Sequence, residues 1–321
     1  MNKKITVWLI VSATLFLAGC ILVGGAMSLM KWDFGKLSTS KYDTYEYTIE
    51  EAFGGILLSA DTADITLTSS EDGLCRVICY EAEARKSTVT VTDGVLTVSA
   101  TDSRKWYQHI GIGVENPEVT VYLPEGEYAS LSVSSHTGKL TVAKGLAFGE
   151  LDITQTTGSI FCYASAERMK IKASTGNITV KGVTVDSADL QVSTGKVTVT
   201  DLIASGTLSV KVTTGNAILT DTACGSFLST GSTGKLEMKN FAATESLSVT
   251  RDTGDVIFER CDAPDITIET DTGDVKGSLL TGKIFTVDTD TGRKSYPDSV
   301  SGGRCKITTD TGDIKITVVG E

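Results

Sequence analysis

The chain has 321 residues, of which 40% are hydrophobic and 21% charged, so it can bury a sizeable core and is not a disordered chain. Its formal net charge of −11 disfavours nucleic acid as a partner, because most of the surface repels phosphate groups. The chain has two histidines, His109 and His136, which leaves little room for a histidine-rich zinc site or for histidine acid–base chemistry.

The amino-terminal segment is long and apolar enough to cross a membrane. Lys3 and Lys4 precede an uncharged run of 26 residues that ends at Met30. As a helix this run would extend about 39 Å at ~1.5 Å per residue, which exceeds the roughly 30 Å hydrocarbon core of a bilayer. We therefore predict a signal anchor or transmembrane helix over residues 1–30. The lysines before it weakly favour a single-pass protein of the cell membrane whose carboxyl-terminal body is extracellular.

The same segment contains a lipoprotein-like motif. Leu17-Ala18-Gly19-Cys20 resembles the lipobox of bacterial lipoproteins, in which the chain is cleaved before the cysteine and lipid is attached to its sulfur. The apolar run continues past Cys20, however, where a mature lipoprotein usually has a polar tether. The length of the run favours the uncleaved anchor, and both alternatives place the remaining chain outside the cytoplasmic membrane.

An internal repeat is the strongest pattern in the chain. Apolar residues lie seven and five positions before the glycine of each Thr-Gly pair and two and four positions after it, with Lys294 as a polar exception. Around Gly138 these residues are Leu131, Val133, Leu140 and Val142. This alternation indicates two short strands per repeat. The pair recurs every 18 to 20 residues, at Gly138, Gly158, Gly176, Gly195, Gly215, Gly234, Gly254, Gly273, Gly292 and Gly312.

A repeat of this size predicts a stacked fold. A unit of about 19 residues cannot bury its apolar side chains alone, so copies must lie on one another at roughly 4.8 Å per layer. We predict an all-β, single-stranded β-helix, or β-solenoid, with 19–20 residues per coil and a right-handed coil. The predicted division is a linker over 31–47, a first coil and capping β-region over 48–130, and solenoid repeats over 131–321.

The capping region has its own strand signals. Residues 61–67 repeat the later Asp-Thr-Gly-Asp-Ile pattern and are predicted to form an early coil, and Asp93-Gly94 is typical of a two-residue hairpin turn. A cap would cover the open end of a solenoid. Trp106 and Tyr107 are interpreted as part of this cover rather than as a binding patch, because exposed aromatic side chains are the exception.

The Thr-Gly pairs are predicted to be corners rather than sites, because glycine adopts positive φ at low steric cost. Four of them read Asp-Thr-Gly, with Asp252, Asp271, Asp290 and Asp310. This spelling occurs in aspartic proteases, which need two such loops facing each other. Earlier repeats carry serine or threonine in the same slot, so we interpret the carboxylate as a variant of the corner.

Calcium is a second possibility for these aspartates. Stacked carboxylates repel one another, and a cation could relieve the repulsion. Calcium needs six to eight oxygen ligands, however, and the spacing alone does not build such a cage. We therefore assign no catalytic, cofactor-binding or metal-binding residue.

The cysteines other than Cys20 do not suggest a disulfide framework. They occupy different phases of the repeat, and no metal-ligand spacing is present. We interpret them mainly as small core residues. They are Cys75, Cys79, Cys162, Cys224, Cys261 and Cys305.

Several segments together resemble a known family, the bacterial putative-adhesin family of β-strand repeat proteins, formerly a domain of unknown function. The resemblance implies a β-helix on the cell envelope, often on one membrane anchor and sometimes associated with envelope-stress operons. The family has no established catalytic residues to carry over. The segments are the anchor ending in Lys31-Trp32-Asp33-Phe34, Val121-Tyr122-Leu123-Pro124, Leu131-Ser132-Val133, and the serial Ser-Thr-Gly and Asp-Thr-Gly marks.

These features favour a non-enzymatic cell-envelope protein that displays its solenoid for adhesion or other envelope-associated binding. The expected partners are the membrane, through the amino-terminal helix, and cell-wall glycan or envelope proteins, with no nucleic acid and no cofactor. A scaffold or sensor in an envelope-stress signalling system is the alternative. An enzyme acting on extracellular polysaccharide is less favoured, because the short coils lack the large inserted loops that would form a concave substrate groove.

Overall fold

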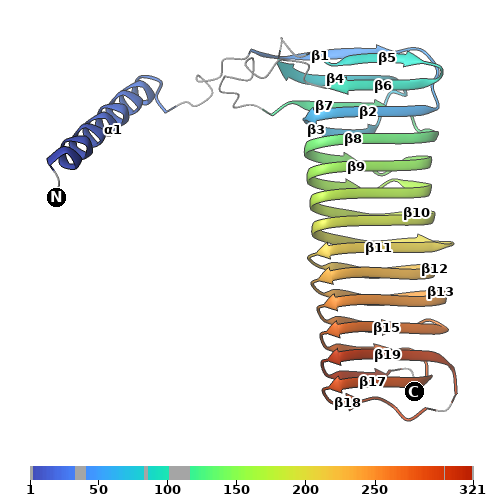
Figure 1. Ribbon diagram of the computed structural model, residues 1–321. Helices are drawn as coiled ribbons and strands as arrows, with labels where there is room; N and C mark the ends of the chain where they lie inside the picture. Colours follow the sequence, from blue (N-terminus) through green and yellow to red (C-terminus); the bar gives the residue numbers. More distant parts are fainter. Residues whose placement is uncertain (1–2, 33–40, 83–85, 101–115, 300, 320–321) are drawn as a thin grey trace.

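The computed structural model describes residues 3–32, 41–82, 86–100, 116–299 and 301–319 (Figure 1). Trp106, Tyr107 and His109 lie outside these ranges, so the predicted aromatic cover of the solenoid end stays a prediction.

The amino-terminal helix α1 (Lys3–Leu29) contains the segment Ile5–Leu29, whose mean hydropathy is 2.4. By length and composition this segment could cross a membrane, as the sequence predicts. None of its most apolar window is buried against the rest of the protein, in contrast to the core helix of a soluble domain. The helix continues without a break through Cys20.

Most of the chain is a β-solenoid built from parallel layers (Figure 1). Paired residues are one repeat apart, as in Leu131 with Leu151 and Thr137 with Thr157. The predicted fold class is therefore confirmed. The layers are formed by β8 (Gly126–Val142), β9 (Leu146–Cys162), β10 (Ser165–Ala204), β11 (Thr207–Thr214), β12 (Ala217–Thr233), β13 (Leu236–Thr253), β14 (Val256–Cys261), β15 (Asp265–Thr272) and β16 (Val275–Leu279).

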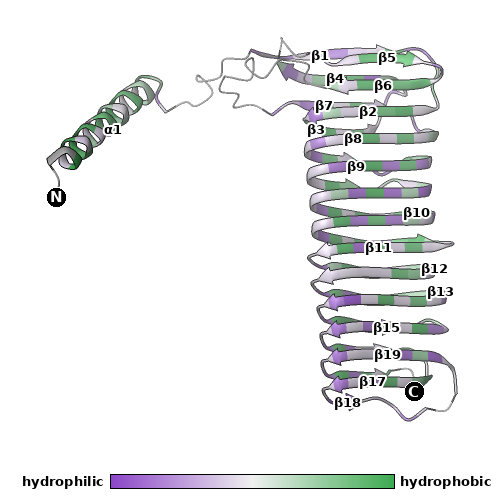
Figure 2. Ribbon diagram, in the orientation of Figure 1, coloured by the Kyte–Doolittle hydropathy of each residue, from purple (hydrophilic) through white to green (hydrophobic). Residues whose placement is uncertain are grey.

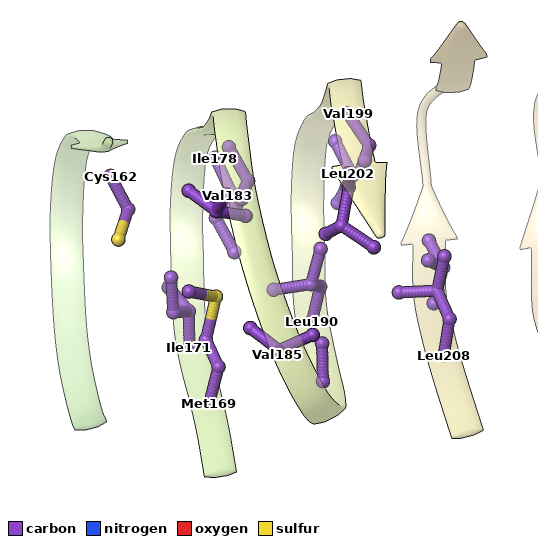
Figure 3. Close-up of a cluster of buried hydrophobic side chains, with 14 of the residues drawn as sticks. Cys162, Met169, Ile171, Ile178, Val183, Val185, Leu190, Val199, Leu202 and Leu208 are labelled. Carbon is purple, nitrogen blue, oxygen red and sulfur yellow. The ribbon is translucent and has the colours of Figure 1, made fainter. Parts of the chain in front are cut away.

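The interior of the solenoid is a continuous apolar core. The residues seven and five before the corner glycines and two and four after them point inward, except after Gly292, where Lys294 and Tyr296 are exposed. Leu131, Val133, Leu140 and Val142 are each at most 2% exposed. Figure 3 shows equivalent side chains of successive layers, such as Ile171 and Leu190, stacked inside the coil. The intervening residues face solvent, which gives the alternation of apolar and polar positions along each strand in Figure 2. Each layer therefore buries its apolar face only because a neighbouring layer covers it.

Parallel and antiparallel strands lie together at the amino-terminal end of the stack, where the sequence predicts a cap. Strands β2 (Gly55–Thr62) and β3 (Asp64–Ser69) form the early coil, which pairs with β8 on one side. On its other side lie β6 (Val95–Ala100) and β7 (Glu118–Leu123). Beyond them are the antiparallel strands β4 (Cys75–Ala82), β5 (Thr88–Thr92) and β1 (Tyr42–Ile49).

Two details of this region bear on the sequence analysis. Asp93 and Gly94 both have positive φ, 51° and 72°, as the predicted two-residue turn between β5 and β6 requires. Residues 42–47 were predicted as part of a linker, but they belong to β1, which pairs with β4 along its whole length. The polar, tyrosine-rich sequence of β1 lacks a clear apolar alternation, because an edge strand buries only part of one face. The strand was therefore not predicted.

The carboxyl-terminal layers are not stacked in sequence order, which departs from the predicted succession. Strands β19 (Gly303–Thr311) and β20 (Ile314–Val318) lie between the layer of β15 and β16 and the layer of β17 (Lys283–Thr291) and β18 (Lys294–Ser295). Neighbours across this junction are 39 residues apart, as Asp265 and Arg304 are, rather than 19 or 20.

The different lengths of β18 and β20 explain why the last two layers are not in chain order. The five residues of β20 pair with all five residues of β16, whereas β18 has two residues and is followed by Tyr296 and Pro297. Proline lacks the N–H needed to extend a ladder, so the shorter strand is better placed at the end of the stack.

Candidate functional site

The Thr-Gly corner is a structural column, as predicted. The ten glycines of the Thr-Gly pairs have φ between +123° and +159°, and a Cβ on any of them would collide with a backbone carbonyl of the adjacent layer. For Gly195 that carbonyl belongs to Gly176. Glycine is therefore required by close packing between layers as well as by its own backbone conformation. The threonine before each glycine is exposed in every layer.

The residue after each glycine forms a second column that links the layers. Where it is Asn or Asp, its side-chain oxygen accepts a hydrogen bond from the backbone N–H of the equivalent residue in the next layer. Lys196 N donates to Asn177 Oδ1 at 3.1 Å, and Asp313 N donates to Asp274 Oδ1 at 2.8 Å. Arg293 ends the column in the last layer, where its Nη2 lies 2.7 Å from Asp313 Oδ2.

These bonds account for the aspartates that follow glycine. Asp255, Asp274 and Asp313 each accept a backbone N–H, with Asp274 N to Asp255 Oδ1 at 3.1 Å and Arg293 N to Asp313 Oδ1 at 2.9 Å as further steps. A hydrogen bond from Lys276 lowers the pKa of Asp274, and a hydrogen bond from Arg293 lowers the pKa of Asp313. The carboxylates of Asp274 and Asp313 are therefore charged at neutral pH, and they act as acceptors for backbone N–H groups.

The four aspartates of the Asp-Thr-Gly pairs form one exposed column, in the spatial order Asp252, Asp271, Asp310, Asp290. The order differs from the chain order because of the inserted layer. The structure brings them into a row on one corner and not into the facing pair that an aspartic protease needs. Within the described part of the chain, no three or more His, Cys, Asp or Glu residues are gathered so that they could hold a metal ion.

A basic groove runs beside the first half of this corner. It has a volume of about 300 Å³ and is lined by residues 154–155, 172–174, 191–193, 211 and 213, which come from four successive layers. We call it the lysine groove, because its charged lining residues are Lys172 and Lys211 and no carboxylate lines it. The residues three positions before the glycines, which face inward, form its floor. The outward-facing residues four and two positions before the glycines form its two walls.

The charges around the lysine groove are arranged so that these two ammonium groups remain free. Lys170 Nζ lies 2.8 Å from Asp152 Oδ2, and Gln191 Nε2 donates to both carboxylate oxygens of Asp189 at 2.8 and 3.0 Å. Asp152 and Asp189, each two residues before a lining residue in its layer, are thus already engaged. Lys172 is half-buried and Lys211 is exposed, and neither has a hydrogen-bond or ion-pair partner within the structure described.

One end of the groove contains a buried amide. Gln155 is 2% exposed, and its Nε2 donates to the carbonyls of Gly138 at 2.5 Å and Thr157 at 3.1 Å. Its Oε1 is buried without a partner in the described structure. The other floor positions, Ala173 and Val192, are apolar and face the core.

Other hollows on the molecule differ from the lysine groove in their charges. One of about 240 Å³ is lined by Arg304 and Lys306, but these cations are paired with Asp265 and Glu269. Two larger hollows have acidic linings. A groove of about 520 Å³ on another face is lined by Glu127, Glu167 and Asp186 and by no basic residue. A second, of about 590 Å³ near the cap, includes Glu50 and Glu51. The charged residues that line the lysine groove are thus positive, whereas those of these two hollows are negative. It also shows that stacked coils form a concave surface without the inserted loops that the sequence analysis considered necessary.

The cysteines of the solenoid and cap are buried thiols. All seven are free thiols, and the six in the solenoid and cap are buried. Desolvation raises the pKa of Cys162, Cys224 and Cys305 to about 12. At neutral pH these groups are uncharged thiols and behave as small core residues, as predicted.

Two features escaped the sequence analysis. The first is a second corner, six residues after the glycine, at which Gly182, Asp201, Asp221, Asn240 and Arg260 have φ between 49° and 65°. Asp and Asn tolerate this left-handed conformation better than most residues, so the corner leaves no glycine signature.

The second missed feature is Arg251, which lies in the core and is 1% exposed. Its Nη2 donates to Ser229 Oγ at 2.8 Å, while its Nε and Nη1 have no partner in the described structure. Desolvation lowers its pKa to about 10. Gly231 leaves the space that the guanidinium fills. Ser229 and Arg251 are polar residues at core positions, and together with Gly231 they could have indicated the buried arginine from the sequence.

The fold and surface define a class: a β-solenoid behind an apolar amino-terminal helix, with polar columns and open grooves on its faces. The chain belongs to the Toastrack DUF4097 family, whose model matches residues 54–316. The resemblance to adhesin-like repeat proteins is thereby confirmed. No curated protein matches the chain.

Solved structures with similarity to the chain have low sequence identity. A putative adhesin from Bacteroides fragilis NCTC 9343 is 16% identical with a TM-score of 0.41, over 75% of this chain and 98% of that one. A putative adhesin from Parabacteroides distasonis ATCC 8503 is 12% identical with a TM-score of 0.47, over the same shares. A putative cell adhesion protein from Clostridium sporogenes ATCC 15579 is 11% identical with a TM-score of 0.27, over 87% and 100%. We therefore argue function from the residues of this chain.

Proposed function

We propose that the protein is a non-enzymatic component of the cell envelope, which holds its β-solenoid outside the membrane as a binding surface for adhesion. The observation that carries the proposal is the combination of one apolar helix with a stack of layers that presents open grooves and polar columns to solvent. The stack fixes the spacing of exposed side chains, which suits the capture of a repeating or extended partner. The names of the similar structures agree with such a role.

The location of the solenoid can be tested with a single added thiol. Thr207 is exposed at the start of β11 and lines none of the grooves described above, whereas the native cysteines of the solenoid and cap are buried. In intact cells, a membrane-impermeant maleimide should label the full-length Thr207→Cys variant and leave the wild-type chain unlabelled. Labelling that appears only after the cells are lysed would place the solenoid in the cytoplasm and contradict the proposal.

The kind of partner can be tested by crosslinking the anchored protein in living cells. Capture of cell-wall glycan supports adhesion. Capture of one defined membrane protein supports the scaffold or sensor role instead, and turnover of a captured glycan supports an enzyme. A variant that carries only residues 1–41 controls for capture by the anchor itself.

A further inference from the structure

The lysine groove combines features that select for one kind of ligand. Lys172 and Lys211 occupy the same position of the coil, four residues before a glycine, with Gln191 in the layer between them. Two layers separate the ammonium groups by roughly 10 Å along the axis, at about 4.8 Å per layer. The chain as a whole carries a net charge of −11, so a groove whose charged residues are all basic stands out from its surroundings.

The rest of the lining is rich in hydroxyl groups. Ser174, Ser193 and Thr213 form one wall and Thr154 belongs to the other, and all four are exposed. A hydroxyl group both donates and accepts hydrogen bonds, so this wall can match the hydroxyl groups of a sugar. No aromatic residue lines the groove, and its apolar residues, Ala173 and Val192, are buried, which disfavours an apolar peptide.

The groove is open along the axis of the solenoid, because it crosses four layers without a loop that closes it. A linear polymer can therefore lie along it and extend beyond both ends. From its charge, hydroxyl lining and axial direction, we propose that the lysine groove binds an acidic polysaccharide, with carboxylate groups on the chain paired with Lys172 and Lys211. This inference rests on the proposed function and names the class of ligand for it.

The test uses the full-length protein in a neutral detergent and a fluorescein-labelled oligogalacturonate as the probe, with fluorescence anisotropy as the readout. The variant Lys172→Gln/Lys211→Gln should lower the affinity by about tenfold or more, because both cationic partners are removed, and added salt should weaken wild-type binding. The matched control is Lys181→Gln/Lys196→Gln. It removes two other exposed lysines of β10, changes the net charge equally and should alter the affinity by less than about twofold.

A second variant blocks the groove without changing its charge. Ser193→Tyr places a large side chain in the lining without a change in charge and should also weaken binding, while its melting temperature stays near that of the wild type. A neutral dextran oligomer should not bind. Three results would overturn the inference. The two lysine double variants could lose affinity equally, inorganic polyphosphate could bind as strongly as oligogalacturonate, or oligogalacturonate could fail to bind. None of these outcomes alters the maleimide result, so the location of the solenoid is judged separately.

Discussion

The two halves of the Thr-Gly corner share a backbone and differ in chemistry. Up to Gly234, the position two before each glycine is a hydroxyl residue or His136, and residues 126–234 contain eight acidic and eight basic residues. From Gly254 onward the same position is aspartate, and residues 235–321 contain sixteen acidic and eleven basic residues. The corner glycines have a positive φ in both halves, from +123° to +145° up to Gly234 and from +143° to +159° beyond it. This corner therefore requires glycine, while the exposed residue two positions before it can vary and determines the charge of the surface.

The largest expected effect comes from the part that both halves share. Gly195→Ala should destabilise the protein by about 3 kcal/mol or more, because the added Cβ collides with the Gly176 carbonyl at a φ of +145°. Gly182→Ala is the matched control, since Gly182 has a φ of +65° and no atom lies within 4 Å of its added Cβ. It should cost about 1 kcal/mol. Urea unfolding of the full-length variants measures both, and equal costs would show that the layers do not pack closely at this corner.

The boundary between the halves contains the buried guanidinium of Arg251. Arg251→Met should stabilise the protein by about 1–3 kcal/mol, because it replaces an uncompensated buried charge with an apolar side chain of similar length. Lys181→Met, at an exposed position, should change the free energy of unfolding by at most about 0.5 kcal/mol. A clear destabilisation by Arg251→Met would indicate that the guanidinium has a partner that offsets its desolvation.

The aspartate half depends on side-chain bonds between layers. Asp274→Ala should cost about 1 kcal/mol, because the N–H of Asp313 loses its acceptor. Asp274→Asn keeps an acceptor, as Asn177 and Asn216 do in the other half, and should cost less. Thermal unfolding of the two variants compares them. Equal losses would assign the effect to the ion pair with Lys276 rather than to the ladder.

The smallest expected effect is a difference in acid sensitivity. The pKa values of Asp274 and Asp313 are lowered in the folded state, so their contribution to stability is present above their ordinary pKa of 3.8 and is lost as the pH falls through the lower folded values. The melting temperature should therefore fall less steeply below about pH 4 in Asp274→Asn/Asp313→Asn than in the wild type. Parallel pH profiles of the two proteins would contradict this contribution.

Much of this architecture is visible in the sequence because its physical causes are local and periodic. The glycine period and the alternation around Gly138 indicate strands, layers and core without knowledge of any long-range contact. The cap strands follow from the same alternation and from Asp93-Gly94. The second corner was missed because Asp201 and Asn240 reach a left-handed conformation without glycine.

The surface was less predictable. The lysine groove depends on which layers are neighbours and on the engagement of Asp152 and Asp189 by Lys170 and Gln191, which spacing alone does not reveal. Arg251 was missed because its inward position was not connected with Gly231 one layer away, where the absence of a side chain leaves space for the guanidinium. The insertion of β19 and β20 depends on a competition between two similar strands for β16, which a repeat pattern treats as equivalent.

Each column and the lysine groove depend on the claim that layers stack in phase, and the order of the aspartates in their column also depends on the position of β19 between β15 and β17. Disulfide formation between added cysteines tests this directly, because a bridge requires Cα atoms less than about 7 Å apart. On mild oxidation, Thr267→Cys/Lys306→Cys should form an intramolecular disulfide, since these residues are paired neighbours. Thr267→Cys/Thr286→Cys should not, because Lys306 separates them. A bridge in the second variant and none in the first would show that the layers follow chain order and contradict the structure described here.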